Sequence, residues 1–182
     1  MLFPLFLRID GKRVLVVGGG GVAERKALDL ADAGARVTVV APEISEAIAR
    51  DDRITLERRS FEESDVDGAW LVIAATDDPV TQVRACEAAD LAHVFAVAVD
   101  DPPNGSAYSA SVIRRGPFTV AISSSGEAPA ISRLLREVLE QALPEEDWLE
   151  SARALREKWR RDGTPMTSRF TELVRAFKDR AS

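Results

Sequence analysis

The stretch Arg13–Leu28, RVLVVGGGGVAERKAL, places four consecutive glycines directly after an apolar run and before a charged segment. Glycine loses more conformational freedom on folding than other residues, and it adopts backbone conformations that they avoid. The β-branched residues before the glycines favour a strand, and small and apolar residues then recur at helical spacing from Val22 to Ala31. The stretch therefore predicts a strand, a tight turn and a helix.

Gly18, Gly20 and Ala23 have the spacing of a dinucleotide-binding turn. In such a turn glycine lets the backbone leave the strand sharply and leaves room for a pyrophosphate, which faces the free amides of the helix tip. The acidic residue that commonly holds the adenosine ribose is absent from the end of the second strand, where Pro42 and Glu43 follow instead. We expect NAD as the cofactor, with NADP left open.

Five short β-branched or apolar runs alternate with helical patterns through the first hundred residues. This alternation predicts an α/β fold with a Rossmann-type parallel sheet, because parallel strands need crossover helices. Asp77 or Asp78 is expected to cap the helix that begins near Pro79. The predicted strands are Arg13–Val17, Arg36–Val40, Ile54–Glu57, Trp70–Ala74 and Phe95–Val99.

After Asp100 the pattern changes to a loop and then to two strand-like runs, AYSASVI (107–113) and FTVAIS (118–123). The two runs either extend the sheet or build a dimer interface. From Ala128 onward the chain is helical in pattern, with breaks at Pro144 and at Gly163-Thr164-Pro165.

The bulk composition narrows the class of protein. The chain has 182 residues, 46% hydrophobic residues and a net charge of −6, which argues against a general nucleic-acid binder. No apolar stretch reaches the length of about 18 residues that a membrane span needs, and the first residues make a poor signal peptide. A single cysteine, Cys86, suits the reducing cytoplasm. With only one histidine besides, His93, the chain has too few ligands for a structural zinc site.

Four motifs in this order and spacing are more specific than the glycines alone: GGGGVAERK (18–26), ATDD (75–78), VDDP (99–102) and ISSSGEAP followed by RLLRE (122–137). With them the chain resembles the siroheme synthase N-terminal type, the precorrin-2 dehydrogenase/sirohydrochlorin ferrochelatase family. The resemblance covers nearly the whole chain.

The resemblance implies an enzyme of siroheme, and so of porphyrin, biosynthesis. Such an oxidoreductase converts precorrin-2 to sirohydrochlorin with NAD, and some members are also lyases that insert ferrous iron as a ferrochelatase. It implies a homodimer, and the composition adds the expectation of a cytoplasmic protein without nucleic-acid or membrane partners. We expect a Rossmann domain over residues 1–112, a dimerisation and substrate-side region with strands over 113–143, and a helical C-terminal region over 144–182.

The resemblance also implies roles for individual residues. Asp100 corresponds to the acidic residue proposed as the general acid and base, and its predicted place at a strand end agrees with that role. Ser124 corresponds to a serine of the substrate-side turn. The positions that contact the dinucleotide are Gly21, Val22, Pro42 and Glu43, beside the motif glycines Gly18 and Gly20.

The implied substrate carries many carboxylates, so an acidic protein has to offer it local positive charge or free amides. The candidates are Arg114 and Arg115 between the two strand-like runs, Arg133 and Arg136 on the next helix, and the amides of Ser124, Ser125 and Gly126.

Val97, Ala107 and Ala110 depart from the residues common in the family at these positions. They keep open an alternative, a dinucleotide-sensing regulatory module with no catalytic activity. Asp100 and the serine-rich turn favour the enzyme, because a sensor needs no second ligand site. An ordinary dehydrogenase of small substrates is disfavoured, because no catalytic His or Lys is evident.

Overall fold

The structure is a computed structural model that describes residues 2–116, 118–142 and 146–178. The chain forms two compact units. The first runs to Ser109 and includes Ser125–Glu127, and the second comprises Ala110–Ser124 and the chain from Ala128 onward. The domain limits expected from the sequence remain predictions.

The first unit is built on a parallel sheet of five strands in the order β3-β2-β1-β4-β5. This sheet confirms the predicted α/β Rossmann-type fold. Three strands have the predicted bounds, while β4 and β5 are each one residue shorter than predicted. The strands are β1 (Arg13–Val17), β2 (Arg36–Val40), β3 (Ile54–Glu57), β4 (Leu71–Ala74) and β5 (Phe95–Ala98).

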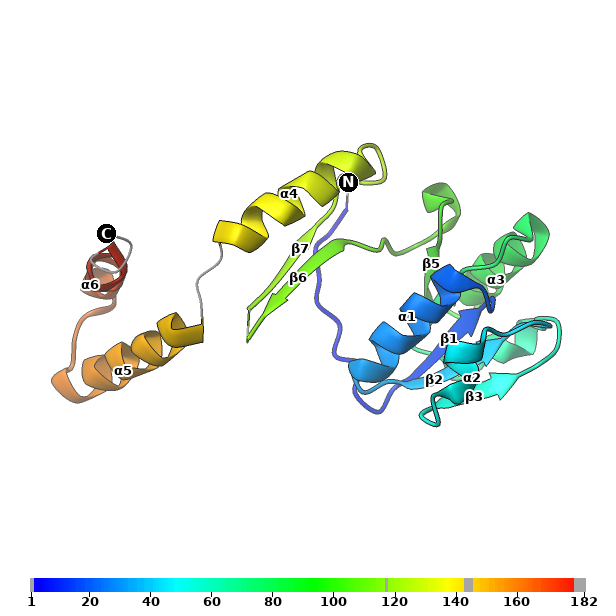
Figure 1. Ribbon diagram of the computed structural model, residues 1–182, viewed down its shortest axis with the longest axis horizontal. Coiled ribbons are helices and arrows are strands. Elements are labelled where there is room, and N and C mark those ends of the chain that lie inside the picture. The colour runs from blue at the N-terminus through cyan, green and yellow to red at the C-terminus, as the bar shows by residue number, and fades with distance from the viewer. Residues whose placement is uncertain (1, 117, 143–145, 179–182) are drawn as a thin grey trace. The chain divides into compact units, whose positions relative to one another are not determined.

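Helices cover both faces of the sheet (Figure 1). Alternate residues of β1 point to opposite faces, so that Val14 and Val16 belong to one core cluster, and Leu15 and Val17 to the other. All four are at most 2% exposed. Burying each such side chain contributes about 1.5–3 kcal/mol, and this explains why the central strand has a continuous apolar run.

One face of the sheet packs against α1 (Gly21–Asp32) and the short α2 (Glu46–Arg50), which the sequence did not predict. The other face packs against α3 (Pro79–Leu91) and the 3-10 turn η1 (Glu63–Val66). A second 3-10 turn, η2 (Pro102–Asn104), lies within the loop that follows β5. Because all five strands are parallel, their carboxyl ends lie at one edge of the sheet.

The second unit begins with an antiparallel hairpin, β6 (Ser111–Arg115) and β7 (Phe118–Ile122), that forms a sheet of its own. The alternative in which these strands extend the main sheet is therefore wrong. Strand β6 starts four residues later than the predicted run. Its register pairs Ser111 with Ile122 and Arg115 with Phe118.

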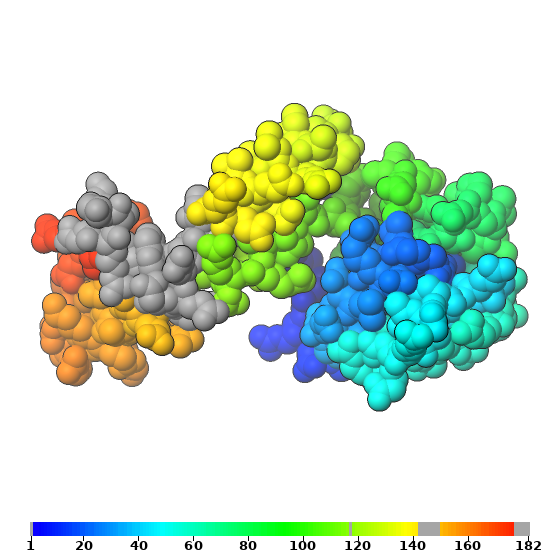
Figure 2. Space-filling model, in the orientation of Figure 1, coloured from blue at the N-terminus to red at the C-terminus, as the bar shows by residue number. Residues whose placement is uncertain are grey.

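Three helices follow: α4 (Pro129–Ala142), α5 (Glu146–Asp162) and α6 (Met166–Lys178). Helix α4 packs against the hairpin, and Figure 2 shows it in yellow against green. Trp159 of α5 is 8% exposed, and its indole N–H donates to Glu172 of α6 at 2.7 Å. Among the described residues, no helix combines the length and the apolar character that crossing a membrane requires.

Candidate dinucleotide and substrate site

The glycine turn lies where the strand order of the sheet reverses. Strand β1 leads through α1 to β2 on one side, while β4 lies on its other side. In open parallel sheets, ligands bind beyond the carboxyl ends of the strands at such a reversal. The topology therefore places the turn after β1 at the expected binding edge.

Gly18 and Gly19 are required by close backbone packing. A Cβ on Gly18 would lie 2.1 Å from the carbonyl oxygen of Ala75, and its φ of 121° is strained for other residues. A Cβ on Gly19 would lie 2.0 Å from the carbonyl oxygen of Glu43. These two glycines let the turn fit between the segments that follow β4 and β2.

Gly20 and Gly21 face open space. A Cβ on either would meet no atom within 4 Å, so the packing of this chain alone does not require glycine there. Gly20 is the N-cap of α1, and within the described residues no side chain caps this helix. The helix tip, with Val22 36% exposed, thus offers free amides and a positive dipole end to an anion. This cradle fits the pyrophosphate of a dinucleotide.

The segment with Pro42 and Glu43 follows β2 and lies against the glycine turn. The amide of Ser45 donates to the carbonyl oxygen of Gly19 at 2.9 Å, and Gly18 donates to Val40 at 3.0 Å. Pro42 and Glu43 are themselves exposed. The structure therefore brings the residues expected to bind the cofactor together at one edge of the sheet.

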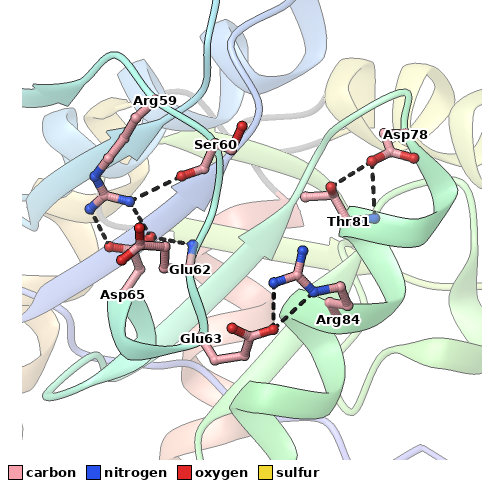
Figure 3. Close-up of polar contacts among 8 residues, drawn as sticks. All are labelled: Arg59, Ser60, Glu62, Glu63, Asp65, Asp78, Thr81 and Arg84. Carbon is pink, nitrogen blue, oxygen red and sulfur yellow. Dashed lines mark hydrogen bonds and ion pairs between the residues drawn. The ribbon is translucent and has the colours of Figure 1, made fainter.

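The segment after β4 completes this edge. Asp78 is the one of the two predicted candidates, Asp77 and Asp78, that caps α3, and it accepts hydrogen bonds from Val80 N and Thr81 N at 3.2 Å each. Figure 3 shows Asp78 beside Thr81, whose hydroxyl donates to it at 2.5 Å and holds the pKa of the carboxyl below its usual range. Asp78 is thus committed to capping.

Asp100 follows β5 at the same edge of the sheet. The strand itself ends at Ala98, and Asp100 has a left-handed backbone with φ of 59°. Its side chain is exposed, and within the part of the chain that the structure describes no hydrogen bond or ion pair engages the carboxylate. A carboxylate that is free and lies at the binding edge can accept or donate a proton.

The predicted substrate-side turn lies beside the loop that follows Asp100. A Cβ on Gly126 would lie 3.1 Å from Cγ of Pro102 and 4.0 Å from Cε1 of Tyr108. Ser125 and Gly126 both have positive φ, at 56° and 84°. The structure therefore brings Ser125 and Gly126 to the Asp100 loop within the first unit.

The remaining predicted substrate residues belong to the second unit. Ser124 accepts from the amide of Ala128 at 3.1 Å, so its hydroxyl braces the start of α4. Arg133 is paired with Glu137 at 3.1 Å, and Arg136 with Glu140 at 3.0 Å. Arg114 and Arg115 end β6 at the hairpin turn, with Arg114 the more exposed.

Lys26 is a candidate site residue that the sequence analysis did not predict. Its ammonium donates to Ser109 Oγ at 3.0 Å and ties α1 to the segment before β6. Burial lowers the pKa of this lysine below its ordinary value. Its position four residues after Val22, on the face of α1 below the helix tip, is the signal that could have identified it.

Comparison with known proteins agrees with this geometry. A family model described as putative NAD(P)-binding matches residues 5–111, and one described as sirohaem biosynthesis protein central matches residues 115–142. A solved structure named SirC, precorrin-2 dehydrogenase, is similar with a TM-score of 0.74, covering 96% of this chain and 88% of that chain at 22% identity. That likeness supports the fold.

Curated relatives are closer in sequence. Siroheme synthase 1 of Aeromonas salmonicida is 48% identical over 145 residues, which are 78% of this chain and 31% of the relative. Siroheme synthase of Escherichia coli O157:H7 is 47% identical over the same length, covering 78% of this chain and 32% of the relative. The chain thus spans about a third of these relatives. This chain belongs to the putative NAD(P)-binding family, whose model matches residues 5–111, and its predicted resemblance to the siroheme synthases is confirmed.

Proposed function

We propose that this chain binds NAD at the glycine turn and oxidises precorrin-2 to sirohydrochlorin in siroheme biosynthesis. The observation that carries the proposal is the shared edge: an open, uncapped helix tip at Gly20 and Gly21, and a free carboxylate at Asp100. The names of the siroheme synthase relatives and of the precorrin-2 dehydrogenase neighbour support the choice of substrate.

The oxidation removes two hydrogens from the macrocycle, one as hydride and one as a proton. NAD, when bound, supplies the acceptor for the hydride. The amides at Gly21 and Val22 hold the pyrophosphate, and Pro42 and Glu43 contact the ribose end. Asp100 receives the proton, and its exposed position lets it pass that proton to water.

The carboxylates of the substrate need positive charge or amides, and we assign this role to the substrate-side turn and to arginines of the second unit. Ser124 and Gly126 offer amides and Arg114 offers charge, while Ser125 and Arg115 already have partners and contribute by exchanging them. Arg133 can contribute only by exchanging its partner Glu137 for a substrate carboxylate.

The proposal extends to ferrous iron as a second substrate. Insertion of the metal into sirohydrochlorin requires removal of the protons on the pyrrole nitrogens, and Asp100 provides a base for this step at the same edge. The protein needs no permanent metal cage for such a reaction.

The test is an anaerobic assay with purified protein, precorrin-2 and NAD. We expect sirohydrochlorin absorbance and NADH to appear together, and siroheme absorbance to follow when ferrous ion is added. Removing a general base costs about 10²–10⁴-fold in rate, so Asp100→Ala should lose turnover by this factor and keep its affinity for NAD. NAD binding without turnover in the natural chain would favour the regulatory module instead.

We also propose that the chain is a homodimer through α4. One face of this helix carries exposed apolar side chains at helical spacing: Ile131 (57%), Leu134 (59%), Leu135 (46%), Val138 (54%) and Leu139 (39%). An apolar stripe of this kind marks an interaction surface, and a second copy presents the same stripe.

Light scattering on the purified protein tests the dimer. We expect twice the mass of the chain for the natural protein and for Glu140→Gln, which alters α4 away from the stripe. Leu134→Glu should give the mass of one chain. A dimer that persists in Leu134→Glu would contradict the role of this stripe.

The proposal places the protein in the cytoplasm, where the buried Cys86 stays reduced.

A further inference from the structure

Gln82 is a buried polar residue that neither the motifs nor the proposed reaction uses. It belongs to α3 and is 8% exposed. Its side-chain amide donates to the carbonyl oxygen of Val99 at 2.6 Å. A buried amide is costly unless it is hydrogen-bonded, so this contact is the reason that a glutamine is tolerated there.

The carbonyl that Gln82 holds belongs to the peptide bond that leads into Asp100. The amide of Val99 is fixed as well, since it donates to Ala74 at the end of β4 at 2.9 Å. On the other side of Asp100, Asn104 N donates to the carbonyl oxygen of Asp101 at 3.1 Å. Asp100 therefore lies between two segments that are each held by hydrogen bonds.

The backbone of Asp100 needs such support. Its φ of 59° lies in the left-handed region, which costs a residue with a side chain free energy and persists only where the surroundings impose it. Since β5 ends at Ala98, the sheet does not hold Asp100 directly. The hydrogen bond from Gln82 is the contact from a rigid helix that fixes the peptide before it.

We infer that Gln82 is a positioning residue, which sets the backbone of Asp100 and thereby aims its carboxylate at the substrate. This inference rests on the proposed oxidation, in which Asp100 takes the proton. Gln82 touches neither the substrate nor the cofactor and acts through the Val99–Asp100 peptide bond.

The test compares Gln82→Met, which keeps the length of the side chain and removes the donor, with Cys86→Ala as its control. Cys86 is buried on α3 one turn later, and among the described residues no hydrogen bond joins it to Val99. A small displacement of a reacting group can cost up to about 100-fold in rate, so we expect kcat to fall about tenfold or more in Gln82→Met. The Kd of NAD should stay unchanged in both variants, and kcat should stay unchanged in Cys86→Ala.

A double-mutant cycle separates positioning from general stability. If Gln82 acts through Asp100, adding Gln82→Met to Asp100→Ala should lower kcat no further. Equal losses in the two backgrounds, or a natural kcat in Gln82→Met, would overturn the inference. Should Gln82→Met fail to fold, Gln82→Leu also removes the donor and keeps an apolar side chain of similar volume, so the same loss is expected.

Crystal structures of the natural chain and Gln82→Met give a readout that does not depend on the reaction. We expect φ of Asp100 to leave the left-handed region in the variant. An unchanged Asp100 backbone would overturn the inference. If the natural chain fails to oxidise precorrin-2, the proposed function fails, while this comparison still decides whether Gln82 sets the backbone of Asp100.

Discussion

Substituting alanine along the glycine turn should separate folding from cofactor binding. In Gly20→Ala the new methyl group meets no atom within 4 Å, and the backbone at φ −81° and ψ −174° is extended, which alanine adopts freely. Replacing a glycine N-cap by alanine costs up to about 1 kcal/mol, and the smaller entropy of the unfolded chain returns about 0.4–1 kcal/mol. The free energy of unfolding should therefore change by less than about 1 kcal/mol.

The affinity of Gly20→Ala for NAD, in contrast to its stability, should fall strongly. The methyl group would occupy the space in which the pyrophosphate approaches the helix tip. Losing one charge-assisted hydrogen bond there costs about 1.5–3 kcal/mol, which weakens the Kd about 10- to 150-fold. Gly18→Ala is the contrast, because its Cβ would lie 2.1 Å from Ala75 O at a φ of 121°. Overpacking and strain together predict a loss of about 3 kcal/mol or more of stability.

Urea unfolding followed by circular dichroism measures the stability of each variant, and isothermal titration calorimetry measures the Kd of NAD. The reasoning predicts a stable Gly20→Ala that binds NAD weakly, and a Gly18→Ala that unfolds at much lower urea concentration. If Gly20→Ala bound NAD as tightly as the natural chain, the assignment of the pyrophosphate to this turn would be refuted.

Two further predictions concern charged groups of the first unit. Arg59 donates to Asp65 at 2.8 and 2.5 Å (Figure 3) and holds the pKa of that carboxyl below its usual range. Asp65→Asn should thus lower the free energy of unfolding by about 1–2 kcal/mol at neutral pH, a figure that already allows for the partial exposure of Arg59. In urea titrations, the difference between the natural chain and this variant should vanish as the pH falls through the folded pKa of Asp65. Burial lowers the pKa of Lys26 from its ordinary value of 10.5, so the charge of this lysine opposes folding at neutral pH. The natural chain should therefore gain stability relative to Lys26→Met as the pH rises from the folded pKa of Lys26 toward 10.5. A difference between the natural chain and either variant that does not change with pH would contradict the assigned cause.

The sequence predicted those parts of the fold that depend on local patterns. Strands β1 and β2 consist mostly of β-branched residues, and their bounds agree with the prediction at every residue. Asp78 before Pro79 is a local capping signal, and it predicted the start of α3. The short α2 was missed because five residues give too little periodicity to be recognised.

Contacts between distant residues could not be predicted in this way. Gln82 meets Val99 across 17 residues and Lys26 meets Ser109 across 83, and both contacts depend on how the helices pack on the sheet. The left-handed backbone of Asp100 is likewise imposed by hydrogen bonds on either side of it. The resemblance identified Asp100, whereas only the structure explains how its position is maintained.

The most direct test of the account is a crystal structure of this chain with NAD bound. The account predicts pyrophosphate oxygens within hydrogen-bond distance of the amides of Gly21 and Val22, and the nicotinamide ring directed toward Asp100. A dinucleotide bound elsewhere on the chain, or a nicotinamide directed away from Asp100, would contradict it.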